Sequence, residues 1–321
     1  MRTPQKLQPG DEIRIVAPSR SASILSNAGI ESAKARLENL GFQVTFGKHL
    51  FEDDLQHSSS IEHRVEDIHA AFADPHVKAI LTVIGGFNSN ELLPYLDYDL
   101  ISRNSKIFCG YSDITAIATA IAACCNFVTY SGPHFSSFQM EKGQAYQTSS
   151  FLRAFTQEAP YPLIASAEWS DDAWYLEGAN RHFERTEWKT YNEGIAEGTI
   201  WGGNLCTLNL LQGTPYMPEL MDAILFVEDD YMVTPELFAR DLTSLLQAAQ
   251  SVKALIIGRF QRESNMFEQQ LHFILDKHPI LKTIPVLYNV DFGHTQPIFT
   301  FPIGGTGTIN TQEKTIYITN T

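Results

Sequence analysis

The feature that most constrains the fold is an alternation of short β-branched apolar runs with helix-like stretches over residues 12–132. Strands are expected at 12–19, 43–47, 77–86, 106–111 and 126–132, with helix-like segments between them. Strands that alternate with helices favour parallel βαβ crossovers, with helices on both faces of an open sheet. The first part of the chain is therefore predicted to be an α/β domain built on a parallel sheet.

The pattern changes twice in the rest of the chain. Residues 151–195 include a charged, tryptophan-rich stretch without a clear period, which is either a linker or a binding loop. From Gly198 onward strand-like runs return around one long helical stretch at 235–249, which indicates a smaller, β-rich α/β domain. The predicted division is a domain at 1–150, a linker and substrate loop at 151–195, and a second domain at 196–321. The expected strands of the second domain are 198–203, 223–229, 253–260, 284–290, 298–305 and 314–320.

Composition and charge exclude several classes of protein. A net charge of −14 over 321 residues leaves no basic field for a phosphate backbone, so nucleic acid is not an expected partner. The apolar runs are too short to span a membrane, and the N-terminus has no apolar segment typical of an export signal. The four cysteines lack C-x-x-C spacing and are interpreted as reduced thiols. We therefore expect a cytoplasmic protein.

Ser112 lies where a strand-like run, 106–111, meets a helix-like run. The apolar positions that follow are spaced at i, i+3, i+4 and i+7, so a helix begins at or just after the serine. A serine hydroxyl at such a turn lies near free backbone N–H groups, which suits a nucleophile and its oxyanion. An N-cap is an equally physical interpretation. The full G-x-S-x-G elbow is absent, and Asp113 stands where that motif continues.

A glycine turn one βα unit earlier is the second candidate. Gly85 and Gly86 end the strand-like run 77–86, and neighbouring βα loops meet at the sheet edge where ligands bind. The Gly86 N–H is therefore expected to approach Ser112, although an ordinary glycine turn is the alternative. No segment here has the G-x-G-x-x-G fingerprint, which makes a nicotinamide cofactor a poor second choice.

A serine nucleophile needs a base, and the chain has ten histidines. Two stand in suitable loops, His134 after the strand-like run 126–132 and His294 between two strands of the second domain. The residues alone do not separate them. Three others are expected to face solvent in or near a charged helix: His63, His69 and His76. A carboxylate that orients the imidazole would complete a triad, and three follow one apolar strand: Glu228, Asp229 and Asp230.

The sequence resembles the serine LD-carboxypeptidase family, peptidase family S66, and within it the branch of microcin C immunity peptidases. The matching segments span most of the chain in the expected order: GYSDIT, GGFNSNELLPYLD, GTIWGGNLCTLNLLQGTPYMP, LFVEDD, IIGRF and NVDFGHTQP. The resemblance implies a Rossmann-like N-terminal domain with a parallel sheet, joined to a smaller β-rich α/β C-terminal domain. It also implies no metal or other cofactor, and a homodimer.

The resemblance further implies roles for individual residues. It makes Ser112 the nucleophile, His294 the base and Glu228 its orienting carboxylate, and leaves His134 a structural role. The implied oxyanion hole consists of two backbone amides: Gly86 and Asp113. The resemblance implies a tryptophan that stacks on a nucleobase, which is Trp174 or, as the less favoured choice, Trp169. It also implies that Asn204 lies near the substrate.

Two activities follow from this resemblance. The favoured one is hydrolysis of the amide-like bond between a peptidyl or aminoacyl group and a nucleotide, because the tryptophan-rich segment matches an insertion of the immunity branch. The alternative is a murein tetrapeptide LD-carboxypeptidase of cell-wall recycling. A protein that only sequesters a nucleotide-linked ligand is a third interpretation, from outside the enzymes.

Overall fold

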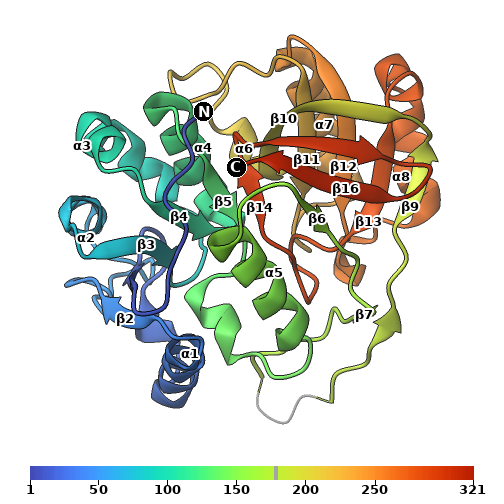
Figure 1. The fold of residues 1–321 in the computed structure, drawn as a ribbon. Helices are drawn as coiled ribbons and strands as arrows, with labels where there is room; N and C mark the ends of the chain where they lie inside the picture. Colours follow the sequence, from blue (N-terminus) through green and yellow to red (C-terminus); the bar gives the residue numbers. More distant parts are fainter. Residues whose placement is uncertain (177–179) are drawn as a thin grey trace.

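The computed structural model describes residues 1–176 and 180–321, and it contains two main β-sheets side by side (Figure 1). Most strands of one sheet come from the first part of the chain, blue to green, and most strands of the other from the last part, yellow to red, but each sheet also takes one strand from the other part of the chain. The two termini meet between the sheets, where Lys6 Nζ donates a hydrogen bond to Thr321 Oγ1 at 3.1 Å. No helix in the described part of the chain is long and apolar enough to cross a membrane.

The first sheet confirms the predicted parallel arrangement. Five of its six strands run parallel to their neighbours, and β14 is antiparallel to β5. Parallel strands place all their carboxyl ends at one edge, which is where the candidate site forms. In spatial order the strands are β14 (Phe301–Ile303), β5 (Thr129–Ser131), β4 (Ile107–Gly110), β3 (Val77–Thr82), β1 (Glu12–Val16) and β2 (Gln43–Phe46).

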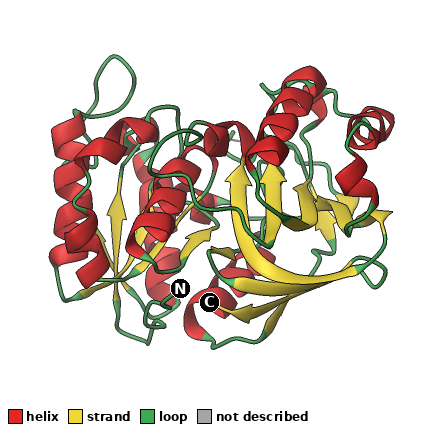
Figure 2. Cartoon of the chain, turned by 90° about the horizontal axis from the view of Figure 1, so that it is seen from above, coloured by secondary structure: helices red, strands yellow, loops and turns green. Residues whose placement is uncertain are grey.

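Helices flank this sheet (Figure 2). They are α1 (Asn27–Asn39), α2 (Ile61–Ala73), α3 (Tyr98–Arg103), α4 (Thr115–Cys125) and α5 (Gln144–Thr156). The α4 helix is apolar on all sides, and every residue from Thr115 to Ala122 is buried, not only the one face that its spacing predicted. The first turn of this helix is therefore held in the core, directly after Ser112.

The second sheet has eight strands and confirms the predicted β-rich part of the chain. Its central strands are parallel and its outer strands antiparallel, in the order β6 (Tyr161–Leu163), β16 (Thr315–Asn320), β15 (Thr306–Asn310), β10 (Ile195–Asn204), β11 (Ala223–Glu228), β12 (Val252–Gly258), β13 (Val286–Val290) and β9 (Lys189–Asn192). Its helices are α6 (Leu205–Asn209), α7 (Pro235–Ala248) and α8 (Glu268–Asp276). A short ribbon pairs β7 (Glu168–Trp169) with β8 (Glu184–Arg185).

One strand lies in a different sheet from the one expected. The sequence analysis grouped 298–305 with the strands of the second domain, yet β14 pairs with β5 at the edge of the first sheet. Its apolar pattern suits either sheet, so the pattern could not decide between them. Because β13 belongs to the second sheet, residues 291–300 have to cross from one sheet to the other, and this crossing segment carries His294.

A buried ion pair anchors the crossing segment. Asp291 accepts a hydrogen bond from Arg259 Nη2 at 2.7 Å, and the two side chains are 0% and 2% exposed. The second oxygen of the same carboxylate accepts from Trp188 Nε1 at 2.8 Å and from Ser166 N at 2.9 Å. The Asp291 carbonyl accepts from Phe299 N at 2.9 Å, which closes the segment into a loop.

We expect Asp291→Asn to lower the free energy of unfolding by about 3–5 kcal/mol, because it leaves the buried Arg259 guanidinium without its counter-charge. Urea denaturation followed by circular dichroism measures this loss. The matched control is Glu38→Gln, which breaks an exposed i,i+4 pair with Lys34 at 3.7 Å and should leave the midpoint unchanged. Equal midpoints for the parent and Asp291→Asn would contradict the anchoring role.

Candidate active site

Ser112 is held on a sharp turn between β4 and α4. Its φ angle of +60° lies in the left-handed region, which is uncommon for a residue with a side chain. The turn is tight because Gly110 has no side chain, since a Cβ there would come within 2.8 Å of Ile114 Cγ2 and would overlap the Thr82 hydroxyl. This geometry turns the serine hydroxyl away from the core at the carboxyl edge of the sheet.

The N-cap interpretation of Ser112 is wrong. The helix α4 has Ile114 as its N-cap residue, and no side-chain hydrogen bond caps it. The Ser112 Oγ instead lies 3.0 Å from His294 Nε2, a residue 182 positions away that arrives on the crossing segment. The sequence could not exclude the cap, because the same serine-before-helix pattern precedes both arrangements.

Glu228 holds the other side of the His294 ring. Its Oε2 lies 2.7 Å from His294 Nδ1, and the side chains of Glu228 and His294 are 3% and 17% exposed. The approach depends on Gly293, which has a φ of +102° and whose Cβ, if present, would come within 3.0 Å of the Glu228 side chain. The structure therefore brings Ser112, His294 and Glu228 into one line of hydrogen bonds.

Asn204 lies beside Glu228 at the end of the neighbouring strand. The two residues are paired in the parallel register of β10 and β11, and Asn204 Nδ2 donates to Glu228 Oε1 at 3.3 Å. The Asn204 Oδ1 caps α6 by accepting from Thr207 N at 3.1 Å. Asn204 is 3% exposed, so in this structure its amide orients the glutamate. Its predicted contact with a substrate stays a prediction.

Only one of the three acidic residues after β11 contacts the histidine. Asp229 is 1% exposed and accepts from Cys206 N at 3.2 Å, and Asp230 accepts from Met232 N at 2.8 Å. Burial, together with the nearby Glu228 charge, raises the pKa of Asp229 well above its usual range. Among the three, Glu228 is therefore the residue that orients the His294 ring.

The electrostatic surroundings of His294 favour its protonated form. Burial lowers its pKa, but the charge and hydrogen bond of Glu228, together with the charges of Asp230 and Asp229, raise it overall above the ordinary 6.5. Glu228 also stabilises the imidazolium that forms when the ring accepts a proton. The hydrogen bond from Nδ1 to Glu228 leaves Nε2 to accept a hydrogen bond from the serine.

His134, the other candidate base, has a different place. Its Nδ1 lies 2.8 Å from Thr82 Oγ1, and its ring stacks on Tyr111 at 4.3 Å. It is 2% exposed, and burial, with the neighbouring His294, lowers its pKa to about 3. An imidazole with so low a pKa is a poor base, so His134 is a structural support under the turn and not a partner of the Ser112 hydroxyl.

The turn at Gly85 and Gly86 lies against the turn at Ser112, and Gly85 is the closer of the two glycines to Ser112. A Cβ on Gly85 would lie 3.2 Å from Ser112 Cβ and 3.4 Å from Ser112 Oγ. Asp113 ties the turns together, because its buried carboxylate accepts from Ser89 N at 2.9 Å and from Ser19 Oγ at 2.6 Å. The sequence analysis missed both serines, whose only signal is their position in βα loops at the same sheet edge. The oxyanion roles of the Gly86 and Asp113 amides stay predictions.

The tryptophans of the segment 151–195 have three different environments. Trp188 is buried and bonded to Asp291, as described above. The ring of Trp169 lies under two guanidinium groups, with Arg259 Cζ at 4.6 Å and Arg262 Cζ at 5.3 Å from its centroid. Trp169 also lines a small cavity of about 180 Å³. Trp174 lines a larger cavity of about 420 Å³ that reaches the start of α1, with Glu141, Lys142 and Arg181 also in its wall. None of Ser112, Glu228 and His294 lines this larger cavity.

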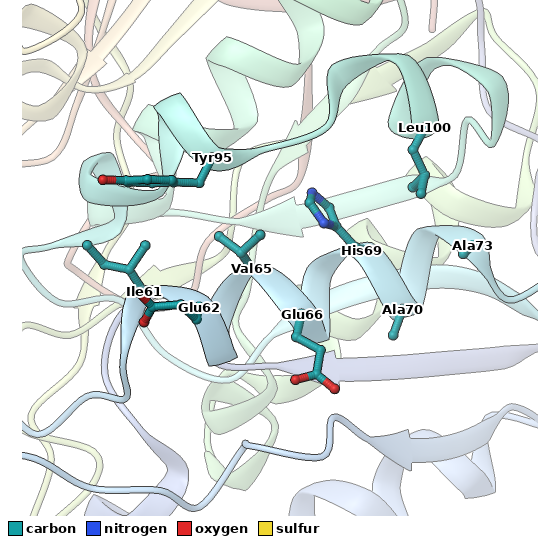
Figure 3. Close-up of a pocket in the computed structure, with 9 residues that line it drawn as sticks. All are labelled: Ile61, Glu62, Val65, Glu66, His69, Ala70, Ala73, Tyr95 and Leu100. Carbon is teal, nitrogen blue, oxygen red and sulfur yellow. The ribbon is translucent and has the colours of Figure 1, made fainter.

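A further cavity, of about 600 Å³, lies between α2 and the segment that leads into α3 (Figure 3). Its wall is mainly apolar, and it includes Val65, Tyr95 and Leu100. None of Ser112, Glu228 and His294 lines it. This groove is therefore separate from the candidate active site, despite its size.

A nucleophile turn, an imidazole and a buried carboxylate between two α/β layers define a serine hydrolase type of site. Family models agree with this class: the LD-carboxypeptidase N-terminal domain matches residues 13–132 and the LD-carboxypeptidase C-terminal domain matches residues 197–309. The chain belongs to the LD-carboxypeptidase family.

Individual relatives cover almost the whole chain. YocD of Bacillus subtilis is 54% identical over 304 residues, 94% of each chain. The microcin C7 self-immunity protein MccF of Escherichia coli is 31% identical over 325 residues, 97% of this chain and 93% of its own. Among solved structures, an MccF-like protein from Bacillus anthracis str. Ames has a TM-score of 0.97 at 49% identity and full coverage of both chains. MccF in complex with glutamyl sulfamoyl guanosine has a TM-score of 0.89 at 30% identity, with 99% and 98% coverage.

We expect an NMR titration to give His294 a pKa above 6.5 in the parent chain and a clearly lower one in Glu228→Gln, because the glutamine keeps the burial but removes the charge. The matched control is Asp230→Asn, which removes a weaker and more distant charge and should shift the pKa much less. A His294 pKa that does not respond to Glu228→Gln would contradict the assigned contact.

Proposed function

We propose that this chain is a serine carboxypeptidase-type hydrolase with a Ser112–His294–Glu228 triad, and that it cleaves the amide-like bond between an aminoacyl or peptidyl group and a nucleotide. The observation that carries the proposal is the pair of contacts at His294, 3.0 Å to Ser112 Oγ and 2.7 Å to Glu228 Oε2. Membership of the LD-carboxypeptidase family supports the general class of reaction.

In the first half-reaction, His294 Nε2 takes the proton of Ser112 as Oγ attacks the substrate carbonyl. The carbonyl π electrons move to its oxygen, which the Gly86 and Asp113 N–H groups would stabilise. When the oxyanion collapses, the carbon–nitrogen bond breaks and the leaving nitrogen takes the proton from His294. Glu228 keeps the ring in the required tautomer and offsets its transient positive charge.

In the second half-reaction, water takes the place of the leaving group. His294 removes a proton from this water, whose oxygen attacks the ester formed with Ser112. The carbon–oxygen bond to the serine then breaks, and His294 returns the proton to Oγ. The products are a carboxylic acid and an amine or amide-like nitrogen on the nucleotide, and the enzyme is restored.

The cavity at Trp174 supports a nucleotide in the leaving group. An indole ring offers a stacking surface for any nucleobase, and the wall carries two basic side chains, Lys142 and Arg181, against one acidic side chain, Glu141. Among the described residues, Arg181 Nε and Nη2 are buried without a hydrogen-bond partner, so they have donors to spare for an anion. Trp169 already lies under two guanidinium groups, and we therefore prefer Trp174 as the stacking residue.

Similar proteins support this substrate class and also an alternative. MccF has been solved in complex with glutamyl sulfamoyl guanosine and with aspartyl sulfamoyl adenosine. The Bacillus subtilis protein named "Probable murein peptide carboxypeptidase" is also 30% identical over 324 residues, which favours cleavage of murein peptides as the second candidate. A cytoplasmic location and a homodimer are further parts of the proposal.

We expect Ser112→Ala to lower kcat by roughly 10⁴-fold or more, with the fold intact by circular dichroism, because it removes the hydroxyl that lies against His294 Nε2. Parallel assays on aspartyl sulfamoyl adenosine and on a murein tetrapeptide measure turnover by mass spectrometry. Cleavage of the tetrapeptide alone would replace the favoured substrate by the second candidate. Full protection of a sensitive strain by Ser112→Ala would instead indicate a sequestering protein.

We expect Trp174→Ala to raise KM for the sulfamoyl adenosine substrate by roughly 5- to 150-fold, the effect of one lost base–aromatic stack, with a smaller change in kcat. Trp169→Ala is the matched control, and it should change KM much less. Steady-state kinetics on both variants decide the point. A larger effect of Trp169→Ala would exchange the two assignments.

A further inference from the structure

A cluster of titratable side chains lies outside the candidate active site, between the loop after β2 and the first turn of α2. His49 Nδ1 and His63 Nδ1 each lie 2.6 Å from the carboxylate of Glu52, one on each oxygen. The two imidazole rings stack nearly parallel, with centroids 3.9 Å apart. The His63 side chain is 45% exposed, in line with the predicted solvent-facing position, and it has this carboxylate as a partner.

Other side chains orient the members of the cluster. Glu66 Oε2 lies 3.0 Å from the second nitrogen of His49, and Figure 3 shows the Glu66 carboxylate directed away from Tyr95. Ser59 Oγ donates to Glu52 at 2.6 Å. A carboxylate on the far nitrogen of an imidazole is the usual outer support of a metal-bound histidine, because it fixes the tautomer and the ring orientation.

We propose that His49, Glu52 and His63 form a binding site for one divalent transition-metal ion, with Zn²⁺ as the preferred ion. One donor atom from each of the three residues lies within 4.8 Å of the other two. Ligand atoms around a tetrahedral Zn²⁺ are ~3.3 Å apart, so the two 2.6 Å contacts to Glu52 have to lengthen as the metal replaces their protons, and the rings have to turn about their side-chain bonds. The side chains of Glu52 and His63 are 42% and 45% exposed, which leaves them free to do so.

The choice of ion follows from the donor set. Two imidazole nitrogens and one carboxylate oxygen suit Zn²⁺, whereas Mg²⁺ and Ca²⁺ prefer oxygen ligands only. Water would complete the fourth position. Binding requires a free electron pair on each Nδ1, so a doubly protonated ring releases one proton as the metal–nitrogen bond forms. The proton on His49 Nε2 stays in its hydrogen bond to Glu66.

The site would act as a structural tether rather than as part of the reaction. The loop that carries Glu52 continues to His57 and Ser58. The His57 carbonyl accepts from Ser21 N at 2.8 Å, and Ser58 Oγ donates to the Ser19 carbonyl at 2.6 Å. Ser19 in turn bonds to Asp113. A metal ion would therefore stabilise a loop that supports the nucleophile turn from outside.

Zinc titration of the full, tag-free chain, treated with a chelator and dialysed, tests the proposal. We expect isothermal titration calorimetry at pH 7.5 to show one equivalent of Zn²⁺ bound and the melting temperature to rise, with no such effect of Mg²⁺. His63→Gln should bind at least ~100-fold more weakly, and Glu66→Gln roughly 10-fold more weakly, through the lost outer support. His76→Gln, which removes an exposed histidine elsewhere, is the matched control and should bind as the parent does.

Acid should weaken the binding. The ring of His49 faces the carboxylates of Glu52, Glu66 and Asp67. The ring of His63 faces Glu52 and lies near Glu62. A cation beside the cluster, Lys48, pairs with Glu66. At pH 5.5 protons compete with the metal for the two ring nitrogens, because a doubly protonated imidazole must give up a proton to bind it. The proposal is overturned if the parent binds no Zn²⁺ at 100 μM, or if the parent and His63→Gln bind it equally. Circular dichroism of metal-free His63→Gln separates lost binding from lost folding.

Discussion

The position of His294 between Ser112 and Glu228 is the contact on which the architecture of the site depends. Its two partners belong to different sheets, Ser112 to the end of β4 and Glu228 to the end of β11. A histidine can reach both only on a segment that leaves one sheet and enters the other. The segment is held at both ends. The buried pair of Asp291 with Arg259 fixes its start, and the pairing of β14 with β5 in the first sheet fixes its end.

The same contact explains the charge state of the site. One ionised carboxylate beside one imidazole is favourable in a buried place, whereas further charges there would be costly. The surroundings supply that balance, because burial keeps His134 neutral with a pKa of about 3 and raises the pKa of Asp229 well above its usual range. The direct contact of His294 is therefore with one carboxylate, that of Glu228.

Much of this fold could be predicted from local pattern, and the site only in part. The alternation of strands and helices over 12–132 identified the parallel sheet, and parallel strands put their βα loops at one edge. Ser112 and the glycine turn were found in this way. The choice between His134 and His294, and among three acidic residues after β11, was open to spacing alone, because neighbours in the sequence were equally suitable. Resemblance to a family made that choice before the structure placed the residues.

The helices and strands, the turn at Ser112 and the family are all legible in the sequence, because periodicity, glycine placement and extended similarity are local or linear properties. The sheet that receives β14 and the carboxylate that reaches His294 became clear from the three-dimensional arrangement alone. Those outcomes depend on contacts between residues far apart in the chain, 182 positions for Ser112 and His294. Burial and the competition between possible partners decide such contacts, and neither can be read from the order of residues along the chain.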